Sequence, residues 1–253
     1  MAASGWMATS APASAHGWIV NLGARVGTQP GYEGADHNLL VPGPTLSIKS
    51  ADAPDRFSPH DENFSIALIS AQYISLGPVV RFRAKRSDEG MRQGLTEVGW
   101  AAEPGGFIDL WPTNFLRLHA EGRKGFGGHH GWLGDGGVDL VYTGKRWGAA
   151  IGPRYGWGDN KYMRTYFGVT PSEAAASPFI AAAYAPGQGE RYAGVEASAE
   201  YKLTSHWKTS IDFGYHRLSD KAAASPIVQV DGSRHQYIAG VSLSYMFGIG
   251  IRR

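Results

Sequence analysis

Apolar side chains alternate with small or polar ones at a period of two through most of this chain. The last such run, 234–247, has its apolar side chains at Tyr237, Ala239, Val241, Leu243, Tyr245 and Phe247. Runs over 191–203, 206–217, 147–157 and 116–123 repeat the pattern, as do runs near 18–26 and 76–85. Successive side chains of a β-strand point to opposite faces, so a period of two predicts strands. The chain is therefore expected to be all-β.

A soluble sandwich also alternates, but two features favour a barrel in a membrane. The non-apolar face is rich in Gly and Ser, which suits a crowded interior. The apolar face carries aromatic side chains at or near strand ends, as in the girdles of membrane barrels, where rings lie at the boundary with water. The predicted aromatic girdle is Trp18, Trp111, Trp147, Trp157, Trp207, Tyr245 and Phe247.

The connections predict a closed antiparallel transmembrane β-barrel. Tight turns near 112–114, 143–145 and 204–206 alternate with longer polar stretches at 86–94, 124–131, 159–190 and 218–233. Bacterial barrels place short turns in the periplasm and long loops outside. The pattern gives about twelve strands, an even number, with ten possible because prolines blur it over 36–62.

The longest loop contains a helix-start motif. Thr170 is followed by Pro171 and, three residues after the threonine, by Glu173, the arrangement of a capping box with proline in the first turn. We expect a short helix through 174–176, ending before Pro178, in an extracellular loop that folds over or into the barrel mouth.

The barrel is expected to occupy 17–247. Residues 1–16 form an Ala/Ser-rich leader with a small-residue pattern at Ala13, Ser14 and Ala15, read either as the remnant of a signal peptide or as a disordered segment. Residues 248–253 are expected to be a C-terminal tail.

Composition excludes several function classes. The 253 residues carry a net charge of +2 with scattered Lys and Arg, which does not indicate a nucleic-acid partner. There is no cysteine, so thiolate metal sites and a cysteine nucleophile are excluded. No apolar run approaches the ~20 residues of a membrane helix, a test that does not detect barrels.

Several separated segments resemble the MipA/OmpV family of outer-membrane proteins. They are 162–177, reading YMRTYFGVTPSEAAAS; 203–207, reading LTSHW; 220–228, reading DKAAASPIV, followed by 232–234; and the Leu76-Gly77-Pro78 and Gly128-His129-His130-Gly131 stretches. Because these motifs fall in family order over about 17–247, the chain is identified as a member.

The resemblance implies a monomeric, non-enzymatic scaffold in the cell outer membrane, surrounded by outer-membrane lipids. Its implied partners are a lytic transglycosylase and a bifunctional penicillin-binding protein, which cut and build peptidoglycan. Two other functions stay open: a channel for ions or small solutes, and a surface adhesin or antibiotic- or stress-susceptibility factor. This expectation rests on analogy, because a fold does not determine a function.

Charged side chains on the inward face form the candidate site. The predicted lumen charge network is Arg81, Arg83, Arg117, Glu121, Arg123, Asp139, Arg154, Glu196, Glu200 and Asp212. These charges could select ions or serve catalysis, but mixed signs in a narrow lumen favour mutual neutralisation and filling.

Motifs of catalysis and of metal binding are missing from the sequence. His119 and His216 are expected to point inward with Ser210, but no nucleophile elbow accompanies them. His129 and His130 are expected in a solvated loop, without a metal-binding signature. We therefore expect no catalytic residue, no cofactor and no metal.

Overall fold

The computed structural model describes residues 17–57, 59 and 64–250. Its strands are β1 (Trp18–Pro30), β2 (Asn38–Ser50), β3 (Ser65–Ala67), β4 (Ile69–Ser70), β5 (Ile74–Arg83), β6 (Ala101–Thr113), β7 (Leu116–Lys124), β8 (Phe126–Gly127), β9 (Trp132–Thr143), β10 (Trp147–Gly158), β11 (Gly189–Lys202), β12 (Trp207–Leu218) and β13 (His235–Ile249). Its helices are η2 (Gly90–Arg92), α1 (Asn160–Phe167), α2 (Pro171–Ala176), α3 (Asp220–Ala223) and α4 (Pro226–Asp231). Among the described residues, no helix is both long and apolar enough to cross a membrane.

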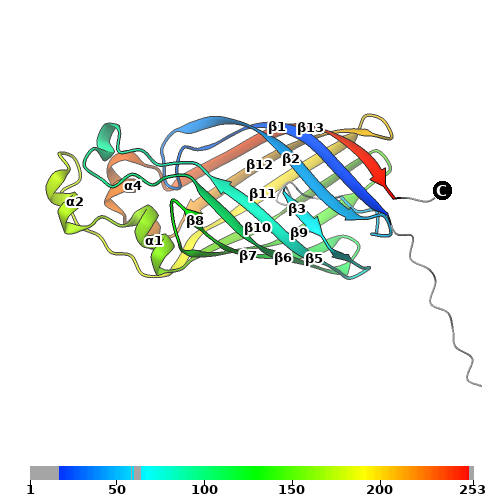
Figure 1. The fold of residues 1–253 in the computed structure, drawn as a ribbon, viewed down its shortest axis with the longest axis horizontal. Helices are drawn as coiled ribbons and strands as arrows, with labels where there is room; N and C mark the ends of the chain where they lie inside the picture. The colour runs from blue at the N-terminus through cyan, green and yellow to red at the C-terminus, as the bar shows by residue number, and fades with distance from the viewer. Residues whose placement is uncertain (1–16, 58, 60–63, 251–253) are drawn as a thin grey trace, which may run out of the picture.

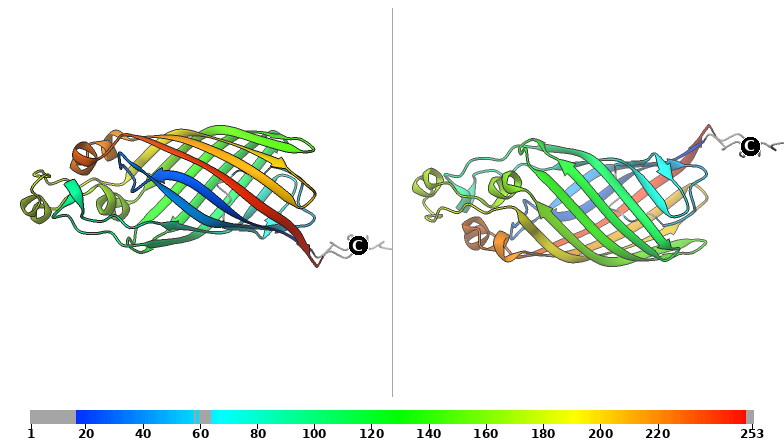
Figure 2. Two further views of the ribbon diagram at one scale, coloured as in Figure 1. Left: turned by 90° about the horizontal axis from the view of Figure 1, so that it is seen from above. Right: turned by 90° about the horizontal axis from the view of Figure 1, so that it is seen from below.

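The strands close into a barrel (Figures 1 and 2). The first and last strands pair antiparallel, with Trp18 opposite Ile249. Eleven of the strands in the described residues form the ring, and β4 and β8 lie outside it. The expected closed barrel is confirmed, with a strand count close to the twelve expected. Closure satisfies the backbone hydrogen bonds that an open sheet edge would leave unpaired in lipid.

One connection departs from the predicted hairpins. After β2 the chain runs through 51–73 before β5, and β3 pairs parallel to β2, with Ser47 opposite Ser65. β3 in turn touches β5 at a single pair, Ser65 opposite Val79. Among the described residues, the ladder that joins β2 to β5 through β3 is therefore short, and it lies next to the stretch 36–62 in which prolines blur the sequence pattern.

The two ends of the barrel differ. All the helices lie at one end, called here the loop end, which is on the left in Figure 1. The opposite end, called the turn end, carries the connections 114–115, 144–146 and 203–206, and β1 begins and β13 ends there. The described residues of the long 51–73 connection also lie toward the turn end, so this connection is an exception to the prediction that turns on that side are short.

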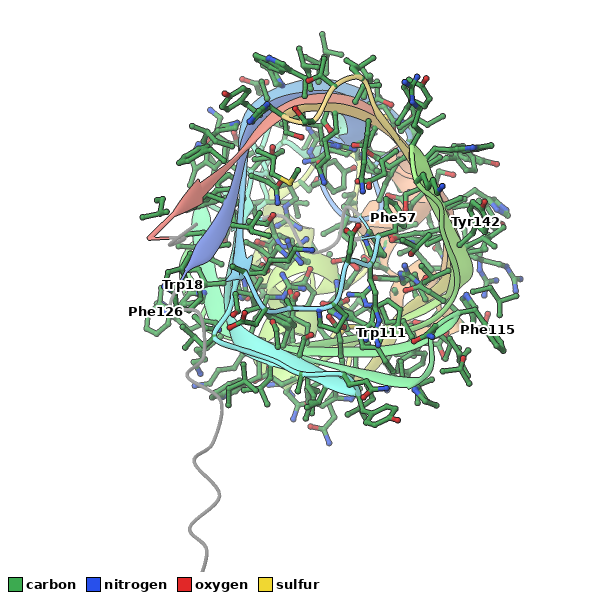
Figure 3. The ribbon with its side chains drawn as sticks, turned by 90° about the vertical axis from the view of Figure 1, so that its right-hand side faces the viewer. Trp18, Phe57, Trp111, Phe115, Phe126 and Tyr142 are labelled. Carbon is green, nitrogen blue, oxygen red and sulfur yellow. The ribbon has the colours of Figure 1, made fainter. Side chains whose placement is uncertain are left out.

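Period-two alternation separates the two faces of the wall. In β7, Arg117, His119 and Glu121 are buried, while Ala120 and Gly122 are exposed. Exposed apolar side chains cover the outside of neighbouring strands, for example Leu140, Ile151 and Ile211. Figure 3 looks along the barrel from the turn end, and shows side chains both inside and outside the ring.

The long loops fold into a compact cap. The cap buries Tyr162, Met163 and Phe167 of α1 against Leu218 and Val228. The predicted capping box is present in α2: the Thr170 hydroxyl accepts from the Glu173 amide, and the Glu173 carboxylate accepts from the Thr170 amide. The short loop helix is thus confirmed. Sequence reasoning missed α1, α3 and α4, although Asp159, Ser219 and Ser225 cap their first turns.

The predicted tail begins too early. Gly248 and Ile249 continue β13, because they pair with Ile19 and Trp18. The barrel strand therefore passes the predicted boundary at 247. The expected leader, 1–16, and residues 251–253 lie outside the described residues.

Candidate functional site: the charged lumen

Buried ion pairs run around the inside of the barrel. Arg117 donates to Asp109 at 2.9 Å and to Asp139 at 3.0 Å. Arg154 lies 2.8 Å from Asp139 and 3.1 Å from Glu196. Alternation along each strand aims these side chains inward, and antiparallel pairing places them beside partners of opposite sign.

A second group of ion pairs lies nearer the loop end. Arg123 contacts Glu103, Glu121 and Asp135. Two arginines of β5 reach the same carboxylates: Arg81 lies 2.8 Å from Glu121, and Arg83 lies 2.7 Å from Glu103. Because each carboxylate is shared, these residues form one network and not isolated pairs.

Two further pairs involve the remaining predicted charges. Asp212 accepts from Arg25 of β1 at 3.0 Å, and Glu200 accepts from Lys208 at 2.9 Å. All ten predicted network residues therefore lie in the lumen and each makes an ion pair. Opposite charges compensate one another throughout, which lowers the cost of burying them.

Sequence reasoning missed several members of the network. Glu103 and Asp109 share the inward face of β6, and Asp135 lies on β9 beside Arg123 and Arg191. Their alternation with apolar neighbours could have predicted that these three carboxylates point inward. Arg191 had no such signal, because the register shifts at this point: Trp157 pairs with Glu190 and Gly156 with Tyr192. This bulge lets both Arg191 and Tyr192 contact Asp135 in the lumen.

A cavity of about 370 Å³ lies in the loop-end half of the lumen. Its wall includes Arg25, Arg81, Arg83, Glu121, Tyr166, Tyr192 and Glu196. Helix α1 packs near β9, β10 and β11 and places Tyr166 in this wall. The cavity is thus lined by paired charges and by tyrosines.

Described residues of the connection after β2 enter the turn-end half of the lumen and narrow it. Phe57 is buried there with Trp111, Val141 and Ala150, and its amide donates to the Thr143 hydroxyl at 3.1 Å. Figure 3 shows Phe57 and Trp111 within the ring and Phe115 and Tyr142 outside it. This segment therefore fills space in the lumen.

Trp111 does not belong to the aromatic girdle, contrary to the prediction. It is only 4% exposed and lies in the lumen, so it cannot face lipid. It lies on the same face of β6 as Glu103 and Asp109, because all three are separated by an even number of residues, and this spacing can be read from the sequence. The assignment was wrong because it weighed the nearness of a turn above the alternation.

The other girdle residues lie on the outward faces of their strands. Trp18, Trp147, Trp207 and Tyr245 are exposed, while Trp157 and Phe247 are half-buried. Trp207 and Tyr245 contact each other edge to face with ring centroids 5.1 Å apart. Most of these side chains lie at the turn end, near the start or end of their strands.

Three histidines contact carboxylates of the ion-pair network. His119 lies 2.7 Å from Asp109, and His216 lies 2.9 Å from Glu196. His129, expected in a solvated loop, is buried and lies 3.0 Å from Glu103. Within the described ranges, no three His, Asp or Glu side chains are grouped as metal ligands would be.

The loop cap has its own charged contact. Arg92 contacts the carboxylate of Asp231, and the Tyr32 hydroxyl donates to the Asp231 carbonyl at 2.6 Å. Burial, followed by the negative charge of Asp231, raises the pKa of Tyr32 to about 12. Tyr32 therefore stays a neutral donor at physiological pH and ties the first loop to the last.

Comparison with known proteins identifies a family. A family model described as MltA-interacting protein MipA matches residues 22–247, nearly the whole chain. No curated protein sequence matches. The NanC porin is a similar solved structure, with 10% identity over 90% of this chain and 98% of that one and a TM-score of 0.39.

Two proteins of Pseudomonas aeruginosa are also similar. The outer-membrane protein OprD shares 13% identity over 92% of this chain and 60% of that one, with a TM-score of 0.35. The N-terminal β-barrel domain of OprF shares 13% over 70% and 98%, with a TM-score of 0.29. The family match, with the apolar outer wall, confirms the expected outer-membrane location.

Proposed function

The chain belongs to the MipA family, and on that premise we propose that it is a non-enzymatic outer-membrane scaffold whose turn end binds a lytic transglycosylase. Short turns of bacterial barrels face the periplasm, where peptidoglycan lies. The turn end is therefore the side on which such an enzyme would dock. A bifunctional penicillin-binding protein would be the second partner, held beside the first.

The described part of the 51–73 connection, residues 51–57, 59 and 64–73, is the observation that carries this proposal. Tight turns alone offer little surface, whereas a standard interface buries about 800 Å² per partner. This connection adds a structured patch to the turn end. Arg56 donates to the Gln72 carbonyl at 2.5 Å, and Asp55 lies 3.4 Å from Lys202 of β11.

The patch offers both apolar and charged anchors. Leu68 and Tyr73 are exposed, and Asp55 is mostly exposed beside Lys202. Exposed aromatic side chains are frequent anchors of protein interfaces. The patch thus has the mixed chemistry of a docking surface.

The structure of the lumen favours the scaffold function over the channel function. Its charges neutralise one another, and the rings of Phe57 and Trp111 narrow its turn-end half. An open pore would need a continuous polar path past these rings. We therefore expect planar bilayers containing the protein to show no steady conductance.

The test is binding between the full chain, folded in detergent, and the lytic transglycosylase of the same organism. We expect micromolar or tighter affinity, falling at least tenfold in the double variant Leu68→Ser/Tyr73→Ser. Phe179→Ser, which changes an exposed ring at the loop end, is the matched control and should leave the affinity unchanged. Absence of binding, or equal binding by both variants, would overturn the proposal.

A further inference from the structure

A groove of about 650 Å³ lies on the outward face of the barrel wall, over β9 to β12. Its floor is formed by Ala149, Ala197 and Ala199; Ala149 pairs with Ala199, and Ala197 is the next outward position along β11. Larger exposed side chains lie on both sides, because Tyr142 is opposite Ala149 and Ile211 is opposite Ala199. The small side chains therefore leave a hollow between two raised apolar borders.

The groove opens toward the bilayer and not toward the lumen. Its side chains alternate with the buried charges of the same strands, so they point away from the ion-pair network. Leu140 and Phe213 extend the two borders and are 59% and 50% exposed. In a membrane, such a hollow loses packing contacts unless hydrocarbon fills it. An acyl chain is therefore the first element that a ligand of this groove must have.

Two aromatic rings lie at the turn-end side of the groove. Trp147 pairs with Tyr201, and each is two residues away from an alanine of the floor, toward the turn end. Both side chains are exposed. Aromatic side chains in such positions mark the boundary between hydrocarbon and headgroups. A chain that lies in the groove thus has its polar end near Trp147 and Tyr201.

Two cations lie just past these rings. Lys145 and Arg146 belong to the turn between β9 and β10 and are exposed. The Arg146 guanidinium donates to the Tyr201 hydroxyl at 3.4 Å, which places it on the outer surface beside the groove. Neither cation has a carboxylate partner in the part of the chain that the structure describes. Unlike the paired charges of the lumen, these two charges are therefore available to a ligand.

The combination of groove and charge favours an anionic lipid over a second copy of the chain. Guanidinium and ammonium groups bind phosphate oxygens through charge-assisted hydrogen bonds, and basic residues beside a membrane surface attract anionic headgroups. A twofold interface on this face would instead bring Lys145 and Arg146 close to their own equivalents. Like charges at the same level repel each other, so the second copy is the poorer occupant.

We infer that this face holds one molecule of an anionic phospholipid from the leaflet at the turn end. One acyl chain lies in the groove over Ala149 and Ala199, and the phosphate accepts from Lys145 and Arg146. The glycerol region lies between them, beside Tyr201. The site requires only that the wall faces lipid, so it is independent of partner docking at the turn end.

The headgroup is tested by native mass spectrometry of the full chain in neutral detergent. Dioleoyl phosphatidylglycerol should give one saturable adduct, bound at least tenfold more tightly than dioleoyl phosphatidylcholine, which has no net charge. The double variant Lys145→Gln/Arg146→Gln should abolish this preference. Lys161→Gln/Arg164→Gln, which removes two exposed cations of α1 at the loop end, is the matched control and should keep it. Equal binding of the two lipids, or a preference that survives in the first double variant, would overturn the proposal.

The groove is tested by filling its floor with a ring. Ala199→Phe should weaken the binding of phosphatidylglycerol at least tenfold, because the ring takes the place of the acyl chain. Ala120→Phe, at an exposed outward alanine of β7, is the matched control and should leave the binding unchanged. Both substitutions add an apolar side chain to the lipid face. The same loss in both variants, or no loss in Ala199→Phe, would exclude the groove as the place of the chain.

The same spectra distinguish the lipid from a second copy of the chain. We expect the species that carries phosphatidylglycerol to be a monomer. A dimer that forms without added lipid and disappears in Ala199→Phe would make a second copy the occupant of the groove and would contradict the lipid site.

Discussion

The guanidinium of Arg117 donates a 3.0 Å hydrogen bond to the carboxylate of Asp139, and both side chains are 0% exposed. Replacing Arg117 with Met should lower the free energy of unfolding by about 3–5 kcal/mol, since Asp109 and Asp139 lose a buried partner. Urea unfolding in detergent micelles measures this. Lys208→Met, at a more exposed pair, should cost at most about 1 kcal/mol. Equal losses in the two variants would contradict a special role for the buried pair.

Phe57→Ala should open and weaken the turn-end half of the lumen. The ring packs with Trp111, Val141 and Ala150, so its loss leaves a void and should cost about 3 kcal/mol. The same variant should raise single-channel conductance in planar bilayers. Phe115→Ala, at an exposed ring outside the barrel, should leave the conductance at its original value. If the conductance of Phe57→Ala equals that of the unaltered chain, Phe57 is not the residue that blocks the lumen.

The tryptophans should divide between lipid and lumen. Brominated acyl chains quench only rings that they touch, so Trp147→Phe should reduce the quenchable fluorescence, because Trp147 is exposed. Trp111→Phe should remove fluorescence without reducing the quenched part. Steady-state fluorescence in brominated and ordinary lipid vesicles makes the comparison. Strong quenching that disappears with Trp111 would place that ring against lipid and contradict its position in the lumen.

The hydrogen bonds of Glu173 at the start of α2 should be lost only in acid solution, well below neutral pH. Desolvation raises the pKa of Glu173, but hydrogen bonds from Thr96 and Thr170 outweigh it and lower the pKa to about 2. A lowered folded pKa gives stability that is fully present above the unfolded value, about 4.3, and is lost as pH falls through about 2.

Amide hydrogen exchange at Thr96 and Thr170 tests this dependence. Protection should be constant from pH 7 down to about 5 and should then decline toward pH 2. Glu173→Gln, which keeps an acceptor oxygen but cannot titrate, should give weaker protection that no longer varies with pH in this window. A decline centred near pH 4.3 in the unaltered chain would show that the carboxylate is not stabilised.

Much of the barrel was predictable from local pattern. Alternation in β7 and β11 identifies the inward face, and with it Arg117, Glu121 and Glu196. The capping box of α2 was also readable, because its hydrogen bonds join residues only three positions apart. Such features depend on neighbours in the chain, so a sequence displays them directly.

Other features needed the closed structure. The inward turn of Arg191 depends on a register shift against β10, and no feature of β11 alone reveals it. The burial of Phe57 against Trp111 depends on which strands the 51–73 connection crosses. These contacts join distant segments, and their energy arises only once the barrel has closed.

The sequence by itself determined that the chain forms strands with one apolar and one charged face, because a period of two can be satisfied only by that geometry. Tertiary structure alone decided which charges pair and which aromatic rings lie in the lumen. Pairing across a barrel depends on register and closure, and both are set by long-range hydrogen bonds and packing that no short stretch of sequence encodes.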